Sequence, residues 1–419
     1  MIKKGYFFVL LLSILSLIIS FKFGLDTATG PQIDFNATWL YVYDLNSDLS
    51  NLYSKRMGID YNKHLHYPLH YLIISRFDFF VENKESFLKI FFLISLFIPV
   101  VFYKCLVLKF ENIEKKNLIL LATLIYLLPS YRSSAMWGNL HITGLFFLLF
   151  SIFFYLKWNK KNENSFNLNI ILQITFLALA SYTVQYYVIL FPFFFIKYIK
   201  FLSIKNFLYL SLFTFILSIP GIIFLILNPL LLFFAVLGSR TTNFLSSILV
   251  TSSIMGFYLI PFFLKSLITD IESVKKKYFC KKNIPNLIIS MIIILSLSPY
   301  FLYIGNVGGG IFLKLSRYLF NNEIIFFLSS FAGFLLLLPL INNKIENFFL
   351  ILLLLISFSS GIYIFHKYFE PMFLIILFCL FDKEITKYFL KKNMLLIYIY
   401  FIAYLLAAII QSKYNLITF

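Results

Sequence analysis

The first apolar run of the chain, GYFFVLLLSILSLIISF (residues 5–21), contains no charged residue and is long enough to cross a bilayer as one helix. Similar runs recur along the 419 residues, which are 61% hydrophobic, 21% aromatic and only 13% charged. A soluble domain carries roughly 25% charged residues, and a water-soluble fold could not bury this much apolar surface. The composition therefore predicts an all-α, polytopic integral membrane protein, because helices satisfy their own backbone in lipid.

About thirteen segments approach the roughly 20 apolar residues that a spanning helix needs. They lie near residues 5–22, 87–104, 117–131, 139–157, 168–182, 184–198, 206–236, 246–264, 286–304, 323–341, 348–365, 368–381 and 394–411. The segment at 206–236 contains Pro220 and Pro229, so we expect it to be bent or broken. No separate soluble domain is visible, and residues 1–419 are predicted to form one transmembrane domain.

Positive charge is distributed unevenly between the predicted connections. If the N-terminus is cytoplasmic, lysines concentrate on the cytoplasmic side of the alternating connections, and all five arginines fall on the other side. The net charge of +18 is then a topology signal, and no motif for binding nucleic acid accompanies it. We expect a multi-pass protein of the cell (inner or plasma) membrane, in contact with membrane lipid and without a nucleic-acid partner.

The longest polar segment, residues 23–86, falls on the extracytoplasmic side of this topology. It is rich in acids and in tyrosine, which favours interfacial helices at the level of the lipid headgroups. Most of these acids suit a solvated loop. Asp34 differs because only about a dozen residues separate it from the first apolar helix, which would hold its carboxylate near the membrane surface. A carboxylate fixed there could act as a general base.

Several short motifs occur in a suggestive order. They are IDFNATWLYVYDLNSDLSNLY (33–53), HYPLHYLIISRF (66–77), MWGNLHITGLFFLLFSIFF (136–154), FPFFFIKYIKF (191–201) and, late in the chain, HKYFEPMF (366–373). This order resembles the GT-C superfamily of membrane glycosyltransferases, and within it the family 87 mannosyl- and arabinofuranosyltransferase-like proteins. The motifs that carry the resemblance are Asp34-Phe35, Tyr67-Pro68 and Gly138-Asn139 with His141.

The resemblance implies a sugar transfer from a polyprenyl-phosphate donor to a glycan or lipid-linked acceptor on the extracytoplasmic face. Asp34 would remove the acceptor proton, and direct displacement would invert the anomeric centre. The leaving phosphate requires cations, for which arginine is well suited. The family usually has a Lys-Pro pair after the fifth helix, where this chain has SYTVQYY (181–187). The candidate substitutes are Arg132, Arg240, Arg317, His366 and Lys367.

Other polar residues have both a structural and a functional interpretation. His64, His66 and His70 flank Tyr67-Pro68 and suit interfacial hydrogen bonding; in the alternative interpretation, His64 or His66 contacts the substrate. Asn139 and His141 lie inside a predicted span, where they would either join helices or line the active site. Glu370 would either pair with Lys367 at the surface or contact sugar or phosphate. The glycine-rich GNVGGG (305–310) lacks a Gly-Lys-Ser/Thr ending, which favours a flexible outer loop over a phosphate cradle.

No group of ligands has a metal-binding spacing, so neither a metal nor a cofactor is expected beyond the lipid-linked donor. Two other functions fit a polytopic chain. A polysaccharide polymerase or ligase would use a lipid-diphosphate-linked glycan, although its largest outer loop usually comes late. A transporter or flippase would show inverted repeats and ionisable residues at mid-membrane, and neither is evident in the sequence.

Overall fold

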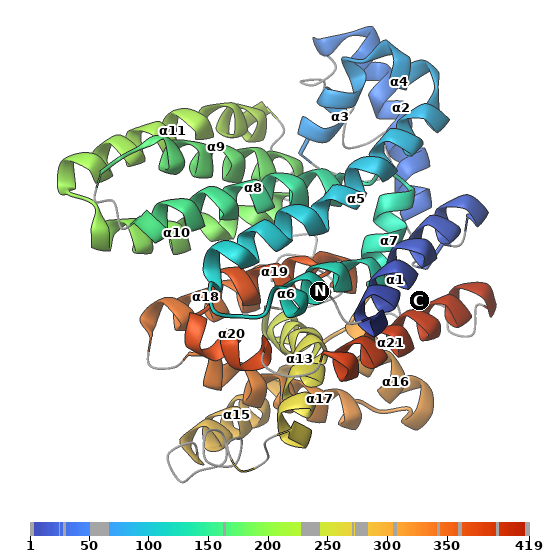
Figure 1. Ribbon diagram of the computed structural model, residues 1–419, viewed down its shortest axis with the longest axis vertical. Coiled ribbons are helices and arrows are strands. Elements are labelled where there is room, and N and C mark those ends of the chain that lie inside the picture. The colour runs from blue at the N-terminus through green and yellow to red at the C-terminus, as the bar shows by residue number, and fades with distance from the viewer. Residues whose placement is uncertain are drawn as a thin grey trace. The chain divides into compact units, whose positions relative to one another are not determined.

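The computed structural model describes residues 4–24, 26–27, 31–50, 67–161, 165–227, 244–269, 272, 284–304, 308–341, 344–358, 363–390 and 394–414. Within these ranges all elements of regular secondary structure are helices, which confirms the predicted all-α class (Figure 1). The chain groups into two compact units, which are described separately. Unit 1 comprises residues 1–111, 118–234 and 405–414, and unit 2 comprises residues 112–117, 235–404 and 415–419.

Unit 1 is built around the neighbouring helices α5, α8 and α9, with the short helices α2, α3 and α4 grouped together (Figure 1). Its elements are α1 (Lys4–Phe23), α2 (Pro31–Ser47), α3 (Leu69–Ser75), α4 (Asp78–Glu82), α5 (Lys84–Lys109), η3 (Leu124–Leu127), α7 (Pro129–Met136), α8 (Leu140–Lys161), α9 (Leu168–Thr183), η4 (Gln185–Ile189), α10 (Leu190–Phe201) and α11 (Ile204–Leu227). The predicted short helices between residues 23 and 86 are thus present in the described part of that segment.

Unit 2 is built around α13, which packs against α15, α16, α17 and α18. Its elements are α13 (Phe244–Thr269), α15 (Ile284–Leu297), η6 (Ser298–Tyr300), α16 (Gly310–Phe320), α17 (Ile324–Leu337), η7 (Leu338–Leu340), α18 (Ile345–Ile356), η8 (His366–Tyr368), α19 (Met372–Cys379) and α20 (Lys383–Leu390). Two further helices, α6 (Lys115–Thr123) and α21 (Leu395–Tyr414), contribute residues to both units.

Five helices in the described residues are long and apolar enough to cross a membrane. They are Lys84–Lys109, Leu140–Lys160, Ile204–Leu227, Phe244–Lys265 and Leu395–Lys413. The predicted span at 117–131 is a helix pair bent by 66°, with an extended Leu128 before Pro129, as proline disfavours a helical residue before it. The protein is therefore a helical protein with membrane-spanning character, and the count of thirteen spans remains a prediction.

The predicted span at 368–381 is wrong as a regular crossing helix. Its helix, α19, has only 8 residues, about 12 Å of helix against a hydrocarbon thickness of about 30 Å. All of its side chains from Met372 to Cys379 are buried. The apolar sequence of α19 therefore serves the interior of unit 2, because a protein core and a lipid tail select the same residue types.

Helix α11 continues through Pro220, where the sequence predicted a bend or break. Proline lacks the N–H of the helix ladder and its ring crowds the preceding turn. The hydroxyl of Tyr182, from α9, enters the ladder at this point. It accepts a hydrogen bond of 3.2 Å from the Gly221 N–H and donates one to the Leu217 carbonyl oxygen. A side-chain hydroxyl thus satisfies the two backbone groups that the proline turn separates.

Helices α13 and α17 approach each other through the same short pattern, SSIMG (252–256) in α13 and SSFAG (329–333) in α17. The Oγ atoms of Ser253 and Ser329 lie 2.6 Å apart. A Cβ atom added to Gly333 would lie 2.1 Å from the Ser252 carbonyl oxygen, and one added to Gly256 would lie 2.7 Å from the Gly333 Cα. Small residues and serine hydroxyls therefore permit a close backbone crossing, a packing mode typical of membrane helices.

We expect Gly333→Ala to force α13 and α17 apart and to lower the thermal unfolding temperature of the detergent-purified protein. Overpacking of this kind costs about 1–3 kcal/mol. Leu328→Ala on the same helix is the control, since Leu328 is 61% exposed and its loss should change the transition temperature much less. An unchanged transition in Gly333→Ala would contradict the crossing described above.

Candidate functional site

Helix α2 carries Asp34 in its first turn and begins at Pro31, whose fixed φ suits a helix start. The N-terminus of a helix favours a negative charge. Buried side chains follow at helical spacing, with Phe35, Trp39 and Val42 facing the interior of unit 1. This stripe anchors the helix, and the half-buried Asp34 side chain lies at its edge.

A pocket in unit 1 brings Asp34 together with the other N-terminal motifs. It is lined by Asp34, Phe35, Trp39, Val42, His70, Tyr71, Ile74, Phe87, Trp137, Gly138, Asn139 and Leu140. The empty space in and before it is about 300 Å³, but the part in which a water molecule can be centred is only about 10 Å³. This smaller space has room for about one water molecule, or for one hydroxyl group of a larger ligand.

The corner between α7 and α8 forms one wall of this pocket. Gly138 has a φ of +55°, and a Cβ added to it would lie 2.5 Å from the Phe87 ring, so both the conformation and the space require glycine. The Oδ1 atom of Asn139 accepts a hydrogen bond of 3.1 Å from the His141 N–H at the start of α8. The predicted Gly138-Asn139 motif is therefore a tight turn that lines the same pocket as Asp34.

Two further residues of this region were not chosen as site residues from the sequence. His70 lies on α3, lines the pocket and forms a hydrogen bond of 2.9 Å between its Nδ1 and the Thr143 Oγ1. Its only signal was its place in the Tyr67-Pro68 motif.

Asp26, directly after α1, was interpreted as a solvated loop acid. Its carboxylate accepts hydrogen bonds from the hydroxyl of Ser133 and, at 3.0 Å, from the indole N–H of Trp137. Because Trp137 lines the Asp34 pocket, Asp26 fixes one of its walls.

Three other predicted residues, Tyr67, His141 and Arg132, lie in unit 1 but are not among the residues that line this pocket. The Tyr67 ring packs 5.8 Å from the Phe224 ring on α11. The Nδ1 atom of His141 lies 3.0 Å from the Tyr186 hydroxyl and its ring stacks on that tyrosine. His141 thus has the helix-joining role that was one of its two interpretations.

Arg132 was a candidate for binding phosphate, and its side chain is only 1% exposed. Its guanidinium donates to the carbonyl oxygen of Ser16 at 2.7 Å, to the carbonyl oxygen of Tyr126 at 2.9 Å, and to the hydroxyls of Ser16 and Ser20. These bonds tie α7 to α1 and η3. A buried cation with this many neutral acceptors stabilises the helix packing rather than presenting its charge at a surface.

His64, His66 and Arg240 lie outside the described residues.

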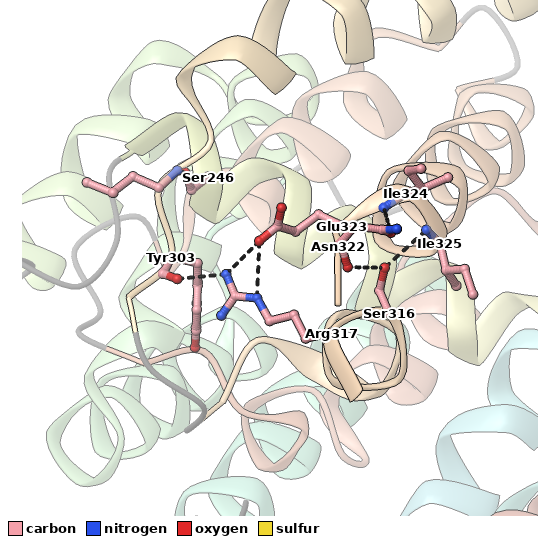
Figure 2. A network of polar contacts seen from close by, with 9 residues as sticks. Ser246, Tyr303, Ser316, Arg317, Asn322, Glu323, Ile324 and Ile325 are labelled. Atoms are coloured by element: carbon pink, nitrogen blue, oxygen red, sulfur yellow. Dashed lines mark hydrogen bonds and ion pairs between the residues drawn. The ribbon is translucent and has the colours of Figure 1, made fainter. Parts of the chain in front are cut away.

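Arg317 in unit 2 is engaged in a local network (Figure 2). Its guanidinium forms an ion pair of 3.1 Å with Glu323 and donates a 2.8 Å hydrogen bond to the Tyr303 carbonyl oxygen. The Ser316 hydroxyl accepts a hydrogen bond from the Ile325 N–H close by. The network closes the turn between α16 and α17, so a phosphate at Arg317 would compete with the carboxylate of Glu323.

The late HKYFEP motif builds a buried hydrogen-bond chain in unit 2. The Ile311 N–H, at the start of α16, donates to His366 Nε2 at 3.1 Å. His366 Nε2 is therefore the acceptor nitrogen, and Nδ1 carries the proton that it shares with the Tyr258 hydroxyl at 2.9 Å. Tyr258 in turn donates to Glu370 Oε1 at 2.5 Å, and Tyr404 donates to the same oxygen at 2.6 Å.

This hydrogen-bond chain corrects the expectation for Glu370. Glu370 is 5% exposed and bound by two tyrosines, so it does not pair with Lys367 at a surface. The ammonium of Lys367 instead lies 5.2 Å from the centre of the Phe365 ring.

The described glycines of the GNVGGG segment, which was expected to be a flexible outer loop, are closely packed: a Cβ on Gly308 would lie 2.4 Å from the Tyr303 hydroxyl oxygen. This part of the segment is a closely packed turn, not an open loop.

The electrostatics of the chain keep His366 neutral. Burial, together with the positive charge of Lys314, lowers the pKa of His366 to about 3. Burial also lowers the pKa of the Lys314 ammonium to about 7. A neutral His366 is what the Ile311 N–H requires, because a protonated ring would have no acceptor. Tyr258 and Tyr404 gave no signal in the sequence, since both sit inside apolar runs.

No group of three or more His, Cys, Asp or Glu side chains in the described ranges is arranged to hold a metal ion. Comparison of the chain with known protein families, with characterised proteins and with solved structures finds no match.

We expect the thermal stability of the protein to fall as the pH is lowered from 7 to 5. An unfolded histidine has a pKa near 6.5 and takes up a proton in this range, whereas His366 with a pKa of about 3 does not. The unfolded state then binds more protons, which costs the folded state about 2 kcal/mol at pH 5.

His366→Gln retains an acceptor for the Ile311 N–H but cannot titrate. Its melting temperature, measured in detergent from pH 7 to pH 5, should fall less steeply than that of the native protein. His366→Ala loses the acceptor and should be destabilised at every pH. Equal slopes for the native protein and His366→Gln would show that His366 is not the group responsible.

Proposed function

We propose that this protein is an integral-membrane glycosyltransferase of GT-C type. It transfers a sugar from a polyprenyl-phosphate donor to a glycan or lipid-linked acceptor on the extracytoplasmic face of the cell membrane. The observation that supports the proposal is the pocket shared by Asp34, His70 and Asn139. The Asp-Phe, Tyr-Pro and Gly-Asn segments, which are far apart in the sequence, contribute to its walls or lie next to them in unit 1.

In the proposed reaction, Asp34 accepts the proton of an acceptor hydroxyl as its oxygen attacks C1 of the donor sugar. The bond between C1 and the phosphate oxygen breaks, and the polyprenyl phosphate leaves with the electron pair. Attack opposite the leaving group inverts the anomeric centre. The space for about one water molecule in the pocket has the size of the reacting hydroxyl, and the sugar ring would occupy the open space next to it.

The leaving phosphate needs a cation. In unit 1, the guanidinium of Arg132 is engaged by internal acceptors, so we do not assign it to the phosphate. Lys84, at the start of α5, is an exposed candidate within unit 1, since its ammonium lies 5.6 Å from the centre of the Trp39 ring beside the pocket.

A transporter is the second candidate, and the observation that favours it is the buried Glu370. A carboxylate bound by two tyrosines and linked to a histidine is the kind of ionisable group that marks proton and ion pathways in membrane proteins. Movement of a lipid-linked sugar across reconstituted vesicles without any glycosyl transfer would favour the transporter.

Asp34→Asn should lower the rate of sugar transfer at least 100-fold while the protein remains folded and inserted, because general-base catalysis contributes about 10²–10⁴-fold. The measurement is transfer from polyprenyl-phosphate mannose and polyprenyl-phosphate arabinofuranose, in proteoliposomes supplied with a membrane lipid extract. Asp48→Asn is the matched control, since Asp48 follows α2 and its carboxylate is bound to exposed Ser50. Full activity in Asp34→Asn would remove Asp34 from this role.

A further inference from the structure

Trp39 carries an unsatisfied hydrogen-bond donor in the wall of the Asp34 pocket. Its side chain is 2% exposed, and its indole Nε1 has no hydrogen-bond partner in the described part of the chain. A buried donor without an acceptor destabilises the folded protein, because it has lost its hydrogen bond to water without replacing it. In the same region the indole N–H of Trp137 is satisfied by Asp26, so two tryptophans that line one pocket differ in this respect.

The chemistry of the pocket indicates which ligand could satisfy Trp39. An indole N–H only donates, whereas the carboxylate oxygens of Asp34 can accept. A hydroxyl compound has oxygens that accept and protons that it donates, so it can serve both residues. A phosphate would serve Trp39 but would be repelled by the carboxylate of Asp34.

Aromatic rings supply the rest of the surface. The Phe35 ring centre lies 5.0 Å from that of Trp39 and 6.0 Å from that of Trp137, and all three side chains line the pocket. Phe87 adds a fourth ring, 5.2 Å from Trp39. Aromatic faces combined with a few polar groups suit the C–H surfaces and hydroxyls of a sugar, as ligand sites generally combine apolar walls with few convergent polar groups.

We infer that Trp39 binds the acceptor sugar, its indole N–H donating to an oxygen of the sugar that is held beside Asp34. The inference rests on the proposed function, and it assigns the neutral acceptor, not the phosphorylated donor, to this pocket. Trp39 would hold the acceptor in place, and Asp34 would take its proton.

The test is the binding of a panel of methyl hexosides and methyl pentosides to the full-length protein in detergent, measured by calorimetry. Trp39→Phe keeps an aromatic ring but removes the N–H. One neutral hydrogen bond contributes about 0.5–1.5 kcal/mol, so the affinity for the glycoside that binds best should fall about 2- to 13-fold. Trp158→Phe is the matched control: Trp158 is equally buried, packs against Tyr155 and Tyr198 and lies outside the pocket.

A second readout needs no substitution at position 39. The chain has three tryptophans, and the glycoside should change the tryptophan emission of the native protein and of Trp158→Phe to the same extent. The inference would be overturned if Trp39→Phe bound the glycoside as tightly as the native protein does. It would also be overturned if the emission change disappeared in Trp158→Phe. The absence of saturable binding by every member of the panel would overturn it as well, and would leave a water molecule as the partner of Trp39.

Asp34→Asn separates this inference from the proposed function. If Asp34→Asn still transfers sugar while Trp39→Phe binds the glycoside weakly, the base is misassigned and the acceptor site stands. If Asp34→Asn is inactive while Trp39→Phe binds the glycoside normally, the role of Asp34 as base stands and the role of Trp39 in acceptor binding is wrong.

Discussion

The structure depends on one constraint: in apolar surroundings, a polar group without a partner in the protein is costly, because neither lipid nor a packed core supplies one. Tyr182 satisfies the backbone at Pro220 in this way. The two terminal nitrogens of Arg132 donate to serines of α1 and to a carbonyl oxygen of η3. His366 accepts from the first turn of α16, 55 residues earlier in the chain. These contacts join elements that are distant in sequence, and they determine which side of each helix faces inward.

The same constraint explains why helix packing here uses small residues. Apolar side chains gain little by leaving lipid for another apolar surface, so close backbone contact and hydrogen bonds between helices become important. The α13–α17 crossing combines both, with Gly256 against Gly333 and Ser253 against Ser329. Accordingly, 83% of the most apolar 18-residue stretch of α13 is buried within the protein. The corresponding share for α11, which is also apolar, is only 11%. Apolar character alone therefore does not distinguish an inner helix from a lipid-facing one.

This ambiguity limits what the sequence could predict. The helical class and the long helices at α5, α8, α11, α13 and α21 follow from the length of their apolar runs. Helix α19 has the same composition but is a short core helix, and only the fold reveals that difference. Among the polar residues, Asp34 and Gly138-Asn139 could be selected together because their motifs occur in a recognisable order. Tyr258 and Tyr404 could not, because a tyrosine within an apolar run is indistinguishable from a packing residue until its hydroxyl partner is known.

The two acids that follow α1 illustrate how surroundings assign a role to a carboxylate. Both oxygens of Asp26 accept hydrogen bonds from side chains of α7 and the residue after it, and the Ser412 hydroxyl donates to its backbone carbonyl oxygen. Removing a proton from a substrate would require Asp26 to give up contacts that hold Trp137 and the end of α1 in place. Asp34, eight residues later, lines the pocket that those contacts shape. Asp26 therefore supports the wall of the pocket, whereas the side chain of Asp34 lines the pocket itself.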